Sequence, residues 1–451
     1  MASLIGKDKD EDNSHDNNKN VIFLKDIYKK IDNGNTHFDN CIFNNLSGNI
    51  GYYEANEHLD LGRMGFNQKA DISFTNCIFN ISVSFYEMVI TCSEPHIFKN
   101  CIFNKTISFN NTTIEHISIE DCVFNSELIF YSCKEIKSIN INSTIFNGTF
   151  SFDAISAVRF TKIIEAEFNC NFNGKVHFKN VMFDYLDISN SIIGDKNFTF
   201  NSCMFNNIAL FRRMNLKSNV VFINTDITNC SFLNSDFENV IFSSPTININ
   251  NLVDLRLLND SHEMNYDDLK RLGMYNADEI ISVVTARSLI MELKTFEKNF
   301  DNMKQFDLAG EFHQRSMDVD REHNSKGLKY IILSLYKFFS DYGENYSKVG
   351  VWFFLIIILF SFLYLFSGLD YIQNDYHSII FYLNCSNIYN FFNDFALSIL
   401  YSTVNSFPVK RDIDFIKAAN GFTVFWSSMQ TIIQGIFITL FIIALRRKFK
   451  R

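Results

Sequence analysis

An apolar side chain recurs every fifth residue over long stretches of this chain. The clearest unbroken run is Phe222, Ile227, Phe232, Phe237 and Phe242. A helix repeats its buried face every 3.6 residues and a strand every two, so a step of five indicates neither element alone. A short fixed period predicts a solenoid, in which each coil packs against the coils before and after it.

The step of five also predicts the cross-section of this solenoid. If every fifth side chain points inward, four five-residue sides close a coil of about 20 residues, and successive coils pair as parallel strands about 4.8 Å apart. Phenylalanine, with 50 copies, then fills the axis. The residue two positions before each Phe also points inward and must be small. Cysteine holds that position at Cys41, Cys77, Cys101, Cys122, Cys203 and Cys230.

This small-x-Phe-x-x unit resembles the pentapeptide-repeat family over residues 36–245. The resemblance implies a right-handed quadrilateral parallel β-helix. The register breaks at about 46–72, 131–145 and 153–170, where we expect loops or bulges. Residues 1–35 are expected to form a polar or disordered tail, because the first 20 contain almost no apolar residues.

Composition and spacing argue against several function classes. Six of the 10 cysteines follow the repeat and no Cys-x-x-Cys pair occurs, so we expect buried reduced thiols, no metal site and no cofactor. The net charge of −9 argues against a nucleic-acid partner. The chain shows no phosphate loop or nucleophile–base cluster, so we do not expect an enzyme.

Two long apolar stretches predict membrane-spanning helices at 349–367 and 422–445. The first contains Val349 to Phe366 without a charge or a proline, and about 20 such residues span a bilayer. Basic residues precede the first stretch and follow the second, which places both termini in the cytoplasm. With no secretory signal visible, we expect a multi-domain β plus α protein of a bacterial inner membrane.

Residues 246–327 are expected to form a helical connector between the solenoid and the membrane. Leu289, Leu293, Phe296 and Phe300 fall at helical spacing, and a second helix follows them as an antiparallel partner. Residues 328–348 predict an interfacial helix and a linker, because the apolar part is too short to span. Phe306 to Glu322, and the Tyr342-Gly343-Glu344 triplet, resemble the connectors of membrane-attached pentapeptide-repeat proteins.

The segment between the two spans is apolar but is interrupted by asparagines. We expect a re-entrant segment at about 385–408, which makes the whole 349–451 region resemble the pore domain of two-helix potassium-type channels. The match departs at the filter, where no glycine follows Thr403 before Gly421, so potassium selectivity is not expected. The residues expected at the pore mouth are Thr403, Asn405, Ser406 and Pro408.

Polar residues also fall on one face of the second span. Ser427, Gln430 and Gln434 have i, i+3 and i+7 spacing. In a membrane such groups face the protein interior, where they either line a pore or hydrogen-bond to neighbouring helices. The sequence leaves both interpretations open.

The leading hypothesis is passive cation conduction by a homo-oligomer, a tetramer by analogy, with a non-standard filter. The cytoplasmic β-helix would then serve interaction with a protein partner, or regulation. The alternative is a membrane-anchored scaffold that does not conduct and that presents the β-helix as a binding surface. Replacing Gln430 and Gln434 with Leu would discriminate, because only the first hypothesis predicts altered permeation.

Overall fold

The computed structural model describes most of the chain and divides into two compact units, Met1–Asn299 and Phe300–Arg451. The described residues are 20–23, 37–44, 58–60, 72–90, 97–154, 160–217, 219–250, 252, 286–373, 375–379, 388–407 and 416–450.

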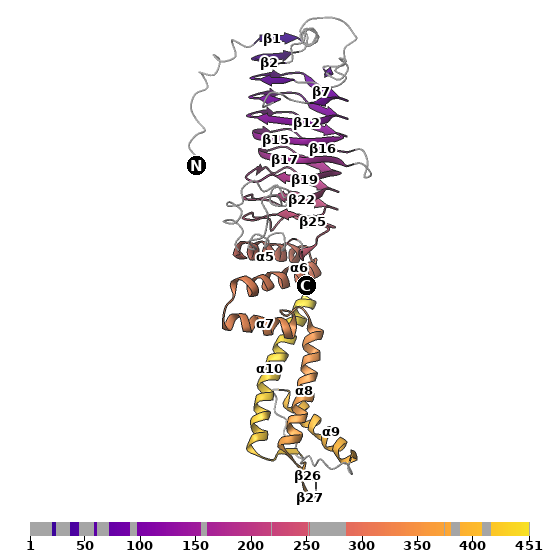
Figure 1. Ribbon diagram of the computed structural model, residues 1–451, viewed down its shortest axis with the longest axis vertical. Coiled ribbons are helices and arrows are strands. Elements are labelled where there is room, and N and C mark those ends of the chain that lie inside the picture. Colours follow the sequence, from indigo (N-terminus) through magenta and orange to yellow (C-terminus); the bar gives the residue numbers. More distant parts are fainter. Residues whose placement is uncertain are drawn as a thin grey trace. The chain divides into compact units, whose positions relative to one another are not determined.

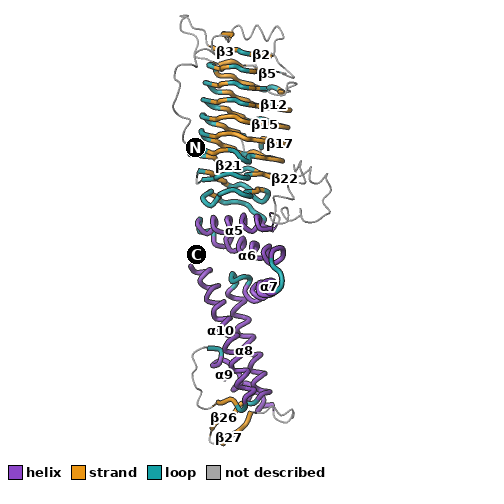
Figure 2. The backbone as a smooth tube through the Cα atoms, turned by 90° about the vertical axis from the view of Figure 1, so that its left-hand side faces the viewer, coloured by secondary structure: helices purple, strands orange, loops and turns teal. Residues whose placement is uncertain are grey.

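The first unit is a β-solenoid of stacked parallel strands (Figures 1 and 2). One sheet of nine strands contains β4 (His58–Asp60), β7 (Ser82–Tyr86), β11 (Ile107–Asn110), β14 (Leu128–Tyr131), β16 (Phe150–Asp153), β18 (Val176–Lys179), β21 (Phe198–Asn201), β23 (Val220–Ile223) and β25 (Ile241–Ser243). The second sheet has 16 strands: β1 (Asn20–Phe23), β2 (His37–Asp39), β3 (Cys41–Asn44), β5 (Ser73–Thr75), β6 (Ile78–Phe79), β8 (Val89–Ile90), β9 (Phe98–Lys99), β10 (Ile102–Phe103), β12 (Thr113–Glu120), β13 (Val123–Phe124), β15 (Glu135–Phe146), β17 (Thr161–Phe172), β19 (Val181–Asp187), β20 (Ile192–Ile193), β22 (Met204–Leu210) and β24 (Cys230–Ser231).

Stacked phenylalanines fill the axis of the solenoid. Phe79, Phe103, Phe124 and Phe146 are completely buried, and their ring centroids are 4.7, 4.4 and 5.0 Å apart in successive pairs. Parallel pairing sets this stack, because Phe103 lies directly opposite both Phe79 and Phe124. At these positions the Phe side chains therefore point inward, as the five-residue step predicts.

The corners and the small-residue column follow from the same repeat. Asn76, Asn100 and Asp121 adopt positive φ angles of 56°, 51° and 53°, which Asn and Asp tolerate better than other L-residues. Each of them immediately precedes a small inward residue. In that column the backbone N–H of Cys101 donates to Sγ of Cys122 at 3.4 Å, so the side chains help to satisfy the turning backbone.

Asparagines form a ladder on the outside of the same coils. The Nδ2 atom of each member donates to Oδ1 of the member one coil earlier, at 2.6 to 3.0 Å. From the third member onward, each lies 21 to 26 residues after its predecessor, so these coils are slightly longer than the predicted 20 or so. The members are Asn44, Asn80, Asn104, Asn125, Asn147 and Asn173.

The register breaks expected around 131–145 and 153–170 are mostly strand. Glu135–Phe146 and Thr161–Phe172 are continuous strands of 12 residues, with one register shift between Asn142 and Thr144. Strand β15 pairs with β12 and β13 of the preceding coil at one constant register, so it follows the same path as those two strands and forms no loop. The register shift against β17 is a bulge, as expected for this stretch. Residues 155–159 and most of 46–72 lie outside the described residues.

A helix closes the C-terminal end of the solenoid. Helix α5 (Ala286–Asn302) places Phe296 against the rings of Phe232, Phe237 and Phe242. Its Asn299 side chain donates to three backbone carbonyls of the last coil, at 2.9 to 3.0 Å. Helix α5 therefore supplies hydrogen-bond donors to these carbonyl groups of the last coil. The expected connector helix thus has a specific task as a cap.

The second unit is helical. It contains α6 (Phe306–Val319), the π-helical turn η4 (Asp320–Asn324), α7 (Leu328–Ser340), α8 (Tyr346–Ser367), α9 (Ile388–Asn405) and α10 (Gly421–Lys450). A small antiparallel sheet joins β26 (Leu369–Gln373), β27 (Asp375–Ile379) and β28 (Ile416–Ala418). Tyr346–Ser367 and Gly421–Phe449 are long and apolar enough to cross a membrane, by length and composition.

The phenylalanine stack can be tested with neighbouring residues of opposite orientation. We expect Phe124→Ala to lower the free energy of unfolding by about 3 to 5 kcal/mol, because it removes a buried ring and leaves a cavity. Val123→Ala, whose side chain is half-buried on the outside of the same strand, should cost about 1 kcal/mol or less. Denaturant titration of the full chain in detergent, followed by circular dichroism, measures both. Equal losses would contradict the assignment of the core.

The buried thiols predict a loss of stability at alkaline pH. Burial raises the pKa of the Cys133 and Cys203 thiols to about 12. An unfolded thiol has a pKa of about 8.5, so the folded state binds the proton more tightly. This contribution is complete below about pH 8.5 and is lost as pH rises toward 12. Unfolding midpoints at about pH 8 and pH 11 should show a smaller decrease for Cys133→Ala than for the parent chain.

Candidate functional site: a polar cluster among three apolar helices

Three helices of the second unit meet at a buried cluster of polar side chains. Gln430 of α10 lies at its centre and is completely buried. Its Oε1 accepts a hydrogen bond from the Tyr364 hydroxyl of α8 at 2.6 Å. Its Nε2 donates to the hydroxyls of Ser402 and Ser406, at 2.8 and 3.0 Å, at the C-terminal end of α9. One amide thus binds α10 to both neighbouring helices.

The cluster continues along α8. The Ser402 hydroxyl donates to the backbone carbonyl of Ile357 at 2.8 Å, and Ser361 donates to the same carbonyl at 2.7 Å. One turn further along α10, Gln434 donates from Nε2 to the Phe353 carbonyl at 3.2 Å. Such bonds hold helices together where the surroundings offer no water.

The other sequence-predicted residues lie around this cluster. Thr403 is half-buried and its hydroxyl bonds to the Ile399 carbonyl of its own helix. The backbone carbonyl of Asn405 accepts from Thr431, whose hydroxyl also bonds to the Ser427 carbonyl. Pro408 lies outside the described residues.

Two buried polar atoms near the C-terminal end of α9 make no hydrogen bond within the described part of the structure. Among the described residues, neither Nδ2 of Asn405 nor Oε1 of the completely buried Gln434 has a hydrogen-bond partner. The remaining polar groups of Ser406, Gln430 and Gln434 form hydrogen bonds within the chain. The hydrogen bonds of Gln430 and Gln434 thus connect α10 to neighbouring helices. A pore-lining role for any of these residues stays a prediction.

Sequence reasoning missed Tyr364 and Ser402 as members of the cluster. Ser398, Ser402 and Ser406 recur every four residues, which places them on one face of an apolar helix. That spacing was the available signal. Tyr364 interrupts an otherwise apolar span, and a buried tyrosine hydroxyl usually finds a partner.

The small sheet brings together the strands that flank α9 in the sequence. β26, which begins directly after α8, pairs antiparallel with β27 before α9 and with β28 after it. The C-terminal end of α9 lies against the middle of α8. There Ser402 donates to the Ile357 carbonyl, and the ring centroids of Phe407 and Phe353 are 6.3 Å apart. The described strands that precede and follow α9 in the sequence, β27 and β28, therefore lie in one sheet at the end of the helical unit where α8 ends (Figures 1 and 2).

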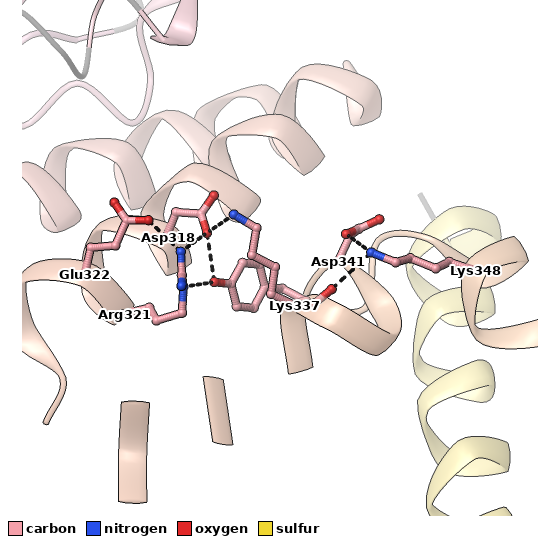
Figure 3. A network of polar contacts seen from close by, with 7 residues as sticks. Asp318, Arg321, Glu322, Lys337, Asp341 and Lys348 are labelled. Carbon is pink, nitrogen blue, oxygen red and sulfur yellow. Dashed lines mark hydrogen bonds and ion pairs between the residues drawn. The ribbon is translucent and has the colours of Figure 1, made fainter. Parts of the chain in front are cut away.

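A second polar network lies at the other end of the unit, where α6, η4 and α7 meet the turn before α8 (Figure 3). The Tyr342 hydroxyl donates to Oδ1 of Asp318 at 2.9 Å and accepts from Nε of Arg321 at 3.1 Å. Lys337 of α7 forms an ion pair with the same Asp318 oxygen at 2.7 Å. Burial, and then the bond to Asp318, raise the pKa of Tyr342, so its hydroxyl remains a neutral donor.

The turn that carries Tyr342 has an unusual backbone. Asp341, Tyr342 and Gly343 all have positive φ, at 47°, 58° and 79°. Arg447, near the C-terminal end of α10, donates from Nη1 to the Tyr342 carbonyl at 2.8 Å and to Glu344 at 2.9 Å. The turn therefore links α7 and α8 with the end of α10, and through Asp318 with α6.

Comparison with known proteins adds a partial similarity. The chain is 25% identical over 164 residues to "Uncharacterized protein MJ1147" of Methanocaldococcus jannaschii. The matched region covers 35% of this chain and 36% of that protein. The chain thus spans about a third of the length of this relative. No family profile matches the chain, and no solved structure matches it. Within the described residues, no group of three or more His, Cys, Asp or Glu side chains could hold a metal ion.

The two glutamines of α10 provide a matched pair of substitutions. Gln430→Leu removes hydrogen bonds to Tyr364, Ser402 and Ser406, whereas Gln434→Leu removes one bond to Phe353. We expect Gln430→Leu to destabilise the helical unit by about 1 to 2 kcal/mol and Gln434→Leu by less than about 1 kcal/mol. Unfolding by SDS in mixed micelles measures both variants. A larger loss for Gln434→Leu would contradict the central position of Gln430.

Proposed function

We propose that this chain forms a membrane channel by homo-oligomerisation and conducts cations passively. In this proposal α8 and α10 cross the inner membrane, both termini are cytoplasmic, and α9 re-enters the bilayer from the side of the small sheet. The solenoid then lies in the cytoplasm and binds a protein partner or regulates the pore. The proposal includes neither a covalent reaction nor a nucleic-acid partner.

The observation that carries the proposal is the path of α9. Helix α9 has 18 residues and brings its polar C-terminal end to the middle of α8, while β27 before it and β28 after it both pair with β26. Non-helical backbone at such a depth is tolerated where protein buries it or where it lines a water-filled cavity. The carbonyl end of a helix also carries partial negative charge, which favours a nearby cation.

A single chain does not supply the pore in this account. Its own polar cluster is filled by hydrogen bonds among α8, α9 and α10. The pore would lie between copies, around the ends of their α9 helices, with a tetramer as the expected assembly by analogy. Because α9 is helical through Asn405, a backbone-carbonyl filter of the potassium type does not form at Thr403 to Asn405. We therefore propose weak selectivity among monovalent cations.

One observation favours the second candidate, a non-conducting membrane scaffold. Gln430, Ser402 and Ser406 are completely buried and bonded within one chain, so their polarity requires no aqueous pore. In that case the solenoid would be the functional surface and the helical unit its anchor.

Single-channel recording on purified protein in planar bilayers tests the proposal. We expect discrete openings from the parent chain and a changed unitary conductance for Thr403→Val, which removes one hydroxyl near the end of α9. Thr295→Val is the matched control, because its hydroxyl also bonds only to the carbonyl four residues earlier, within α5 of the first unit. The control should conduct like the parent.

One result would contradict the channel proposal itself, and a second would contradict the proposed position of the pore. One is electrical silence from protein shown to be oligomeric in the same preparation, which would favour the scaffold. The other is openings that neither Thr403→Val nor Asn405→Leu alters, which would place any pore away from the end of α9.

A further inference from the structure

The outward face of α7 is apolar. Leu328, Ile331, Ile332, Leu335 and Phe338 are between 49% and 72% exposed. These residues lie within 13 residues of helix, whose length of about 20 Å is too short to span a bilayer. A soluble protein rarely leaves so continuous an apolar strip uncovered.

The charged groups of α7 have partners on α6 and η4. Lys337 forms an ion pair with Asp318 at 2.7 Å, and Lys329 forms one with Asp320 at 2.9 Å. Figure 3 shows Lys337 directed toward Asp318 and away from the turn at Asp341. The helix therefore has an ion-paired side and an apolar side, as an amphipathic interfacial helix does.

The apolar face of α7 continues onto α8. The rings of Phe338 and Phe339 lie 5.0 and 5.3 Å from the Trp352 ring, near the start of α8. Val351 and Phe354, on the same part of α8, are 58% and 66% exposed. If α8 contacts lipid, the exposed apolar residues of α7 lie next to the lipid-contacting part of α8, near its first residues. Trp352 lies at the same level, and Trp side chains are enriched at the membrane–water interface.

We infer that the outward face of α7 is a lipid-binding surface, inserted at the boundary between headgroups and acyl chains of the leaflet in which α8 begins. This inference rests on the proposed membrane-spanning role of α8 and α10. Apolar contact supplies the affinity, because Lys329, Lys337 and Lys348 already pair with Asp320, Asp318 and Asp341. Zwitterionic phosphatidylcholine is therefore sufficient.

Tryptophan quenching by brominated phosphatidylcholine tests the position of α7. The background is the full chain with Trp352→Phe and Trp426→Phe, reconstituted into vesicles. Single probes are then introduced as Phe338→Trp on α7, Ile358→Trp in the middle of α8, and Glu311→Trp on the exposed side of α6. Leu335→Trp replaces Phe338→Trp if that variant does not fold.

We expect the α7 probe to lose about half of its emission with lipid brominated near the headgroup, and less with lipid brominated near the chain ends. The α8 probe should show the reverse order, and the α6 probe should be quenched only by aqueous acrylamide. Adding anionic phosphatidylglycerol should change the quenching of α7 little.

Other outcomes separate this inference from the proposal on which it rests. One outcome is that brominated lipid quenches the α8 probe, whereas only acrylamide quenches the α7 probe. This would overturn the lipid-binding role of α7 and leave the membrane spans in place. An α8 probe that no brominated lipid quenches would overturn the spans themselves. Quenching of α7 only in anionic vesicles would contradict the apolar origin of the affinity.

Discussion

The antiparallel pairing of β26 with both β27 and β28 is the constraint on which the second unit depends. It holds the end of α8, the chain on either side of α9, and the chain just before α10 at one place. The Asn420 side chain and the Thr423 hydroxyl reinforce that place through the carbonyls of Ser367 and Gly368, at 2.6 and 2.9 Å. Helix α9 contacts both α8 and α10, through Ser402 and its bonds to Ile357 and Gln430.

Buried polar groups decide how the helices meet. Gln430 satisfies its amide with partners on two other helices, and Tyr342 organises the opposite end through Asp318 and Arg321. Both arrangements follow the rule that a polar atom removed from water must find a partner. The same rule operates in the first unit, where Asn299 of α5 binds three carbonyls that the last coil leaves open.

The sequence predicted the parts of the fold that repeat and little of what joins them. A five-residue step identified the parallel solenoid and its inward phenylalanines, and two apolar stretches identified α8 and α10. It did not reveal that residues 135–146 form one continuous strand, because that continuity depends on pairing with the coils on both sides. Ser427, Gln430 and Gln434 were recognised as one polar face, but their partners Tyr364 and Ser402 come from other helices, and a single helix's pattern does not encode the angle at which its neighbours cross.

The most direct test of the central claim is the sidedness of the chain around α9. Asp370→Cys in β26 and Lys417→Cys in β28 would be labelled separately with an impermeant maleimide in oriented vesicles, with the unsubstituted chain as the background. The eight described native cysteines are buried and should react slowly. A re-entrant α9 predicts that both positions are labelled from one side, opposite to a cysteine introduced at Arg446. Labelling of Asp370→Cys and Lys417→Cys from opposite sides would make α9 a third span and contradict the account.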